Sequence, residues 1–336
     1  MSRDSFGSRF GALVAMAGSA VGLGNLWRFP YLVGENGGAA FIIVYILLSF
    51  LICLPIFISE FVIGRRSQKN AYSAFRDLSG GGVWRFVGLF TVMVPLVVLS
   101  YYSVIGGWSI EYFVKSLTFS FTGNDSQAAM STMFSSFVSN PWLPLICHTG
   151  FLLATTMIVV VGIKDGIEKF SKVMMPMLLL IIAVLVVCSF SMPGTSEGLR
   201  FLLQPDFSKV TPGVVLSAMG QAFFSLSLAM GCLCTYASYF GSDTNLFKTA
   251  CSVSMIDTMV AVLSGFFIFP AVFSVSGVEA NAGPGLVFIT LPNVFNMAFQ
   301  NVPVVGYVFT VLFYLLLLLA ALTSSISLLE SVTAYV

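Results

Sequence analysis

Residues 17–30 read AGSAVGLGNLWRFP and interrupt the first of several long apolar stretches in the chain. Gly22 and Gly24 weaken a helix at this point, and Asn25 and Arg28 place polar groups within an otherwise apolar segment. Backbone freed from a helix inside a bilayer is tolerated only where protein or a water-filled cavity surrounds it. The stretch therefore predicts a broken helix whose free carbonyls and amides bind something, such as Na⁺ or a carboxylate.

A second interruption follows in residues 220–231, which read GQAFFSLSLAMG and are small and hydroxyl-rich at their centre. The two interruptions fall in the first and sixth apolar segments. Interrupted segments at corresponding places indicate an inverted five-plus-five helix repeat with its binding site at mid-membrane. The alternative for either stretch alone is that small residues allow helices to pack closely.

The composition requires a membrane around the chain. Of the 336 residues 57% are hydrophobic and 9% are charged, and the mean hydropathy is +0.97. Soluble domains carry roughly 25% charged residues. We therefore expect an all-α polytopic membrane protein whose lipid bilayer is an obligatory partner. The net charge of +1 gives no indication of a nucleic-acid partner.

The apolar segments and the charges between them predict an orientation. Lysines and arginines gather before the first segment, in the 64–85 loop, after the fourth segment and at residue 248. Because these residues favour the cytoplasm, we expect a cytoplasmic N-terminus, and the short loops suggest a bacterial inner membrane. Eight segments are predicted, at approximately 9–34, 39–63, 86–118, 142–162, 170–192, 212–239, 246–275 and 302–335.

The last segment runs to Val336 without a polar exit, so we expect a fragment that stops after the eighth helix. On this interpretation residues 1–192 form a first repeat of five helices, and residues 193–336 form an incomplete second repeat. Residues 276–301 become an outer loop that is apolar enough to fold back over the core.

Ionisable residues inside apolar segments are functional candidates, because a charge at mid-bilayer costs about 2.5–3.5 kcal/mol or more. We expect Glu60 to accept hydrogen bonds from the freed backbone of a broken helix, and Asp257 to complete a cation site. Glu330 is assigned no role. His148 has no acidic neighbour in sequence and is expected to pack structurally.

Hydroxyl groups cluster in the eighth segment at residues 323–325, which read TSS. Such hydroxyls commonly bond back to their own helix in lipid. Facing a helix break, they would also supply oxygen ligands for Na⁺. The spacing alone leaves both roles open.

These stretches together resemble the neurotransmitter:sodium symporter family. The resemblance is carried by GSAVGLGNLWRFP at 18–30, by 35–38, by 95–102, by 221–239 and by 321–325, and it covers essentially the whole chain. It implies a twelve-helix transporter of which this chain holds helices one to eight. Such a protein imports an amino acid with Na⁺ by alternating access, with helices one, two, six and seven rocking against the rest.

The resemblance implies two sodium sites. The first of them is expected to need no chloride ion beside it. Many members have asparagine at the position of Asp257, and chloride-dependent members have serine at the position of Ala261. The Asp257 carboxylate is therefore expected to replace chloride beside Tyr45 and Gln221. The first site is expected to use Ala20, Asn25, Ser225 and Asp257, and the second Gly18, Val21, Ala320, Thr323 and Ser324.

The resemblance also implies a substrate pocket without a charged side chain, which favours an α-amino acid that is large and hydrophobic or aromatic. Met230, a flexible thioether, favours that size class. Arg28 with Phe224 resembles the outer gate, and Arg3 resembles half of the inner gate. The expected pocket residues are Leu23, Gly24, Val98, Tyr102, Phe224, Ser225, Ser227, Met230, Ser324 and Leu328.

Three other functional classes have to be compared with these sequence features. A sensor that binds an amino acid without moving it has the same sequence features. An intramembrane enzyme would need a catalytic grouping of His, Cys or Asp residues, and no such grouping is apparent in the sequence. A channel or structural membrane protein would not need two broken helices that carry ligand-type residues.

Overall fold

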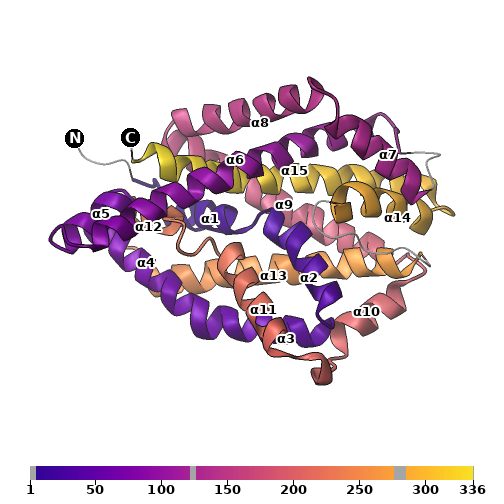
Figure 1. Ribbon diagram of the computed structural model, residues 1–336, viewed down its shortest axis with the longest axis horizontal. Helices are drawn as coiled ribbons and strands as arrows, with labels where there is room; N and C mark the ends of the chain where they lie inside the picture. The colour runs from indigo at the N-terminus through magenta and orange to yellow at the C-terminus, as the bar shows by residue number, and fades with distance from the viewer. Residues whose placement is uncertain (1–4, 122–125, 276–284, 336) are drawn as a thin grey trace.

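The computed structural model describes residues 5–121, 126–275 and 285–335, and the regular elements within them are helical (Figure 1). In chain order the elements are α1 Arg9–Ala20, η1 Gly24–Arg28, α2 Phe29–Glu35, α3 Ala39–Leu48, η2 Ser49–Cys53, α4 Leu54–Ser67, α5 Ala71–Leu78, α6 Trp84–Leu117, α7 Gln127–Val138, α8 Leu143–Val160, η3 Ile163–Glu168, α9 Lys169–Ser189, α10 Thr195–Leu203, η4 Phe207–Lys209, α11 Pro212–Ser225, α12 Cys232–Ala237, α13 Leu246–Phe273, η5 Leu286–Thr290, α14 Leu291–Ala298 and α15 Pro303–Thr333.

Within the described residues, six continuous helices are long and apolar enough to cross a membrane, and one bent pair adds a seventh. The bent pair is Arg9–Ala20 with Gly24–Glu35, which turns by 48°. The remaining predicted segment, 212–239, consists of the two shorter helices α11 and α12. The apolar segments predicted from the sequence therefore correspond to the long or broken helices of the structure.

The first break separates α1 from η1 and α2. Helix α1 ends where Val21 takes an extended conformation, with φ −72° and ψ 111°. The freed Gly22 amide donates to the Asn25 Oδ1 atom at 2.9 Å, so the side chain of Asn25 replaces a lost helical acceptor. The chain then resumes as the π-helical turn η1 and continues into α2. The predicted interruption of this segment is confirmed.

The second break separates α11 from α12 and spans residues 226–231. Ser227, Ala229 and Gly231 have φ values of 53°, 61° and 73°, and only glycine adopts this left-handed region without strain. The amide of Ala229 donates to the Glu60 Oε1 atom at 2.7 Å. The prediction that Glu60 accepts from the backbone of a broken helix is confirmed.

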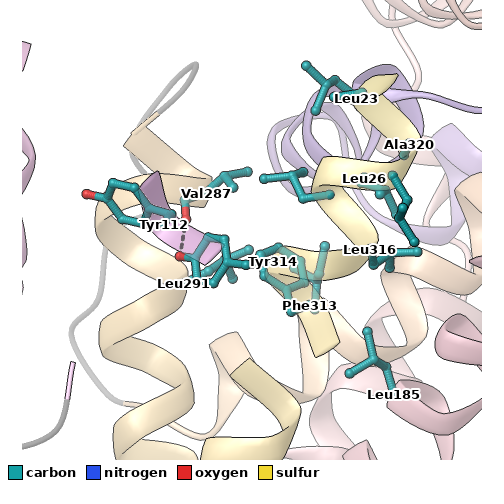
Figure 2. Packing of buried hydrophobic residues seen from close by; sticks show 14 of the residues in the cluster. Leu23, Leu26, Tyr112, Leu185, Val287, Leu291, Phe313, Tyr314, Leu316 and Ala320 are labelled. Atoms are coloured by element: carbon teal, nitrogen blue, oxygen red, sulfur yellow. Dashed lines mark hydrogen bonds between the residues drawn. The ribbon is translucent and has the colours of Figure 1, made fainter. Parts of the chain in front are cut away.

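Helices α6 and α15 run alongside each other through the structure (Figure 1). Helix α15 also carries much of the buried apolar core shown in Figure 2, including the fully buried Phe313 and Tyr314. The Tyr314 hydroxyl donates to the Val287 carbonyl at 2.9 Å, which ties η5 to α15. The described part of the predicted cap, 285–301, thus folds back onto the core. It is largely helical rather than a loop, and residues 276–284 of the cap lie outside the described residues.

The short helices α5, α7 and α10 were not predicted. Helix α5 carries Arg76 and Asp77, and α10 carries Glu197 and Arg200, so neither has the apolar run of a membrane span. Helix α10 packs against the C-terminal part of α13. A search for long apolar segments does not detect such amphipathic connectors.

Close packing of α4 against α12 leads to a prediction about two glycines. A Cβ atom on Gly64 would lie 2.1 Å from the Cys234 carbonyl oxygen, whereas one on Gly150 in α8 would meet nothing within 4 Å. Gly64→Ala should therefore destabilise the protein by about 1–3 kcal/mol through overpacking. Gly150→Ala should stabilise it by about 0.5–1 kcal/mol, because alanine favours the helix.

Thermal unfolding of the two purified variants in detergent measures the difference. Equal melting temperatures for Gly64→Ala and Gly150→Ala would contradict the close approach of α4 and α12.

Candidate functional site

Three polar side chains from different elements meet between the two breaks. Asn25 Nδ2 donates to Asp257 Oδ1 at 2.8 Å and lies 3.1 Å from Ser225 Oγ. The Ser225 hydroxyl lies 2.9 Å from both carboxylate oxygens of Asp257. All three side chains are buried. Three of the four residues predicted for the first sodium site are thus in direct contact, on η1, α11 and α13.

Asp257 is an acidic side chain that has no cationic partner in this cluster. It is fully buried, and its remaining side-chain partner among the described residues is the Tyr45 hydroxyl, 3.4 Å from Oδ2. No ion pair among the described residues includes Asp257. Burying an unpaired carboxylate is expensive, and hydrogen bonds to neutral groups offset only part of that cost. The cluster is therefore suited to hold a cation.

The carbonyls of the first break are held by side chains from two other helices. Gln221 Nε2 donates to the Gly24 carbonyl at 3.0 Å, and the Ser264 hydroxyl donates to the Asn25 carbonyl at 2.8 Å. The Gln221 Oε1 atom is buried and has no hydrogen-bond partner among the described residues. The role of Ser264 was not foreseen, because one serine in a long apolar helix gives no signal in sequence.

The second predicted sodium site also comes together, at the junction of α1 and α15. The hydroxyls of Thr323 and Ser324 lie 3.4 Å and 3.1 Å from the Val21 carbonyl. Thr323 also bonds back to the Ala320 carbonyl at 3.1 Å. A Cβ atom on Gly18 would lie 3.4 Å from the Thr323 Cβ atom, so α1 approaches α15 closely. The sequence left open whether these hydroxyls bond to their own helix or face the break. In the structure they do both.

A cavity of about 30 Å³ lies between the two clusters. We call it the central cavity. Nine of the ten predicted pocket residues line it, and the tenth, Leu23, donates its amide to the Tyr102 hydroxyl at 3.1 Å. None of the described residues that line it is charged. Its lining comprises Ser19, Ala20, Gly22, Gly24, Val98, Tyr102, Phe224, Ser225, Ser227, Met230, Ser324 and Leu328.

A larger cavity of about 770 Å³, which we call the outer cavity, adjoins the central one. The two share four lining residues, and Tyr102 and Phe224 therefore lie at their boundary. Arg28 lines the outer cavity with its guanidinium carbon 5.2 Å from the centre of the Phe224 ring. The structure thus brings together the two predicted outer-gate residues.

At the other end of α1, a buried carboxylate holds the beginning of the helix. Glu168 of η3 accepts from the Gly7 amide at 2.5 Å and the Ser8 hydroxyl at 2.8 Å, and it pairs with Lys172 at 2.6 Å. Sequence reasoning missed Glu168 because it stands among exposed lysines. Arg3, the predicted inner-gate residue, lies outside the described residues.

Two further polar residues are structural in this fold. Glu330 is buried and accepts from the Tyr239 hydroxyl at 2.5 Å. His148 of α8 lies 3.0 Å from the Ser103 hydroxyl of α6, which confirms the expectation of a packed histidine.

Comparison with known proteins places this arrangement among transporters. The model of the sodium:neurotransmitter symporter family matches residues 3–136 and 130–336. An uncharacterised sodium-dependent transporter of Bacillus subtilis, YhdH, is 41% identical over 327 residues, which are 97% of this chain and 71% of YhdH. The sodium- and chloride-dependent GABA transporter 2 of Mus musculus is 28% identical, over 87% of this chain and 56% of that protein.

Among solved structures, MhsT in complex with L-phenylalanine superimposes with a TM-score of 0.89 at 43% identity. The match covers 99% of this chain and 74% of MhsT. At this identity and TM-score the similarity includes the fold and the arrangement of the helices around the site.

The bond between Glu60 and Ala229 predicts a difference between two substitutions. In Glu60→Gln the amide oxygen still accepts from the Ala229 amide. In Glu60→Leu that donor is left without an acceptor, at a cost of about 1–3 kcal/mol. We expect the leucine variant to have a melting temperature several degrees below that of the glutamine variant in detergent. Equal losses in the two variants would show that the contact does not hold the break.

Proposed function

Because this chain belongs to the sodium:neurotransmitter symporter family, we propose that it couples the entry of Na⁺ to the import of an α-amino acid with a large hydrophobic or aromatic side chain. The structural similarity to MhsT, a protein solved in complex with L-phenylalanine, supports this substrate class. The relatives compared are named transporters, which favours transport over a sensor that only binds.

The observation that carries sodium coupling is the buried, unpaired Asp257 beside Asn25 and Ser225. A monovalent cation there would neutralise the carboxylate, with the Ala20 carbonyl as a further ligand. The cluster lacks the sulfur and imidazole ligands that transition metals prefer. The second cluster, at Val21, Thr323 and Ser324, offers only neutral oxygens. We assign one Na⁺ to each cluster, both as co-transported ions.

The substrate is proposed to lie in the central cavity between the two ions. Its carboxylate would accept from the Leu23 and Gly24 amides and the Tyr102 hydroxyl, and would complete the first ion's ligands. Carbonyls near Phe224, Ser225 and Ser227 would take the ammonium group. Because the substrate carboxylate contacts the ion directly, each tightens the binding of the other by the same factor.

The central cavity is smaller than an amino acid, so the room for a substrate depends on movement of its lining side chains. Its volume is about that of one water molecule in the liquid, so an amino acid enters only if lining side chains move. Phe224 and Met230 line both cavities, and Met230 is flexible. Their displacement toward the outer cavity would open the space that a large side chain needs.

The remaining elements of the proposal concern architecture and orientation. We propose an inverted repeat, with residues 1–192 in its first half and 193–336 in its second. In a bacterial inner membrane with a cytoplasmic N-terminus, the basic ends of α1, α4 and α9 would face inward. Alternating access would then move the broken helices, with α3–α4 and α13, against the rest.

The proposal predicts sodium-dependent uptake by proteoliposomes that hold the full-length gene product. Radiolabelled tryptophan and leucine should enter faster than alanine and glycine under an inward Na⁺ gradient, and none should enter with K⁺ in its place. Asn25→Leu should abolish sodium-dependent binding, since it removes the side chain that joins Ser225 and Asp257. Asn36→Leu is the matched control, because among the described residues the Asn36 side chain bonds only within its own turn, to the Leu32 carbonyl.

Each outcome decides one part of the proposal. Sodium-dependent uptake of small substrates alone would reject the size class and keep the coupling. Retained sodium-dependent binding by Asn25→Leu would reject the first site. Sodium-dependent binding without counterflow would identify a sensor.

The Asp257 charge also predicts how chloride dependence can be created. With the carboxylate present, transport should not need chloride, because the fixed negative charge already offsets the cation. The double variant Asp257→Asn/Ala261→Ser should transport only when chloride is present, at a rate that rises with its concentration. Unchanged transport by this variant in gluconate medium would contradict the role assigned to Asp257.

A further inference from the structure

A third cavity, of about 280 Å³, lies apart from the central cavity. It is formed by α2, α10, the C-terminal end of α13 and the beginning of η5; α10 and that end of α13 lie together in Figure 1. Of the described residues that line it, only Tyr31 also lines the outer cavity. We call this space the peripheral cavity. Its lining comprises Pro30, Tyr31, Gly34, Glu35, Phe201, Ile268, Phe269, Val272, Phe273 and Leu286.

Aromatic rings form one wall of the peripheral cavity. The Phe201 ring centre lies 4.9 Å from that of Phe269 and 5.5 Å from that of Phe273. Ile268 and Leu286 are buried behind the cavity, whereas Phe273 is 44% exposed and marks its mouth. The space therefore suits the apolar or aromatic body of a small molecule.

Among the described residues of this lining, Glu35 is the single charged one. No ion pair among the described residues includes Glu35. Its carboxylate accepts a hydrogen bond from the Tyr31 hydroxyl, one turn earlier in α2. A carboxylate accepts about four hydrogen bonds, so most of its capacity is free.

Basic side chains in neighbouring segments have other partners. Arg200 Nε donates to Gln204 at 2.8 Å. Lys209, whose side chain passes close to Gly37, lies 3.9 Å from Asp206. Glu35 thus lies on the exposed side of an aromatic-walled cavity without an ion-pair partner among the described residues. An ammonium group there would gain from the carboxylate charge and from cation–π attraction to the rings.

We propose that the peripheral cavity binds an organic cation, namely a primary or quaternary ammonium compound with an aromatic or branched apolar body. The ammonium group lies between Glu35 and the phenylalanine rings, and the body fills the space toward Ile268 and Leu286. Because α2 continues directly from the break that carries Gly24 and Asn25, occupancy restrains α2 and changes the affinity of the central site. Cation binding itself does not depend on which amino acid is transported.

The test is calorimetric titration of the purified full-length protein with phenyltrimethylammonium. Its neutral carbon isostere, tert-butylbenzene, is titrated in parallel. We expect saturable binding of the cation that saturating L-phenylalanine does not abolish, and at least tenfold weaker binding of the isostere. Glu35→Gln should weaken cation binding at least tenfold. Glu197→Gln, which removes an exposed carboxylate on α10 outside the cavity, should leave it unchanged.

Three results would overturn the proposal. Equal binding by Glu35→Gln and the unaltered protein would remove the carboxylate from the site. Equal losses in Glu35→Gln and Glu197→Gln would reveal a general surface-charge effect. Strict competition with L-phenylalanine would place the cation in the central or outer cavity. A Phe201→Leu variant checks the aromatic wall independently, and unchanged cation affinity there would reject the cation–π contribution.

Discussion

The structure depends on one constraint, which is that polar backbone groups freed at bilayer depth must find partners within the protein. At the first break the partners are Asn25, Gln221 and Ser264, and at the second the partner is Glu60. Three of these four side chains come from helices distant in sequence. The breaks are therefore fixed by tertiary contacts, and Gln221 of α11 joins one broken helix directly to the other.

The two clusters proposed to hold sodium ions differ in how they would stabilise charge. The cluster at Asn25, Ser225 and Asp257 contains a full negative charge, so a cation there is attracted by a carboxylate as well as by dipoles. The cluster at Val21, Thr323 and Ser324 contains dipoles alone, and its hydroxyls also bond to carbonyl groups of α1 and α15. Because these hydroxyls donate their hydrogens to the carbonyls, their oxygen lone pairs are left for a cation. Occupancy there is expected to depend more strongly on how closely α1 lies against α15.

The sequence predicted much of this arrangement because its signals are local. Paired glycines, consecutive hydroxyls and a carboxylate in an apolar helix each stand out in a short window, and the residues of both clusters were identified in this way or through the family resemblance. Ser264 and Glu168 were missed, because their importance lies only in what they touch across the fold. Helices α5, α7 and α10 were missed because amphipathic connectors lack the apolar run that marks a span. The left-handed conformation of Ala229 had no signal either, since alanine rarely adopts it.

Helix α2 connects these features. It begins directly after the π-helical turn that carries Asn25 and Arg28, so its position sets both the first cluster and the wall of the outer cavity. Its other end carries Tyr31 and Glu35, which line the peripheral cavity. At only seven residues, α2 is too short to be stable alone and takes its position from the helices around it. A ligand that alters the contacts of α2 with α10 or α13 therefore acts on the helix that follows directly from η1, which carries Asn25 of the first cluster. Coupling between the peripheral and central cavities then needs no long relay of side chains, because α2 lines the peripheral cavity and follows directly from η1, whose Gly24 lines the central cavity.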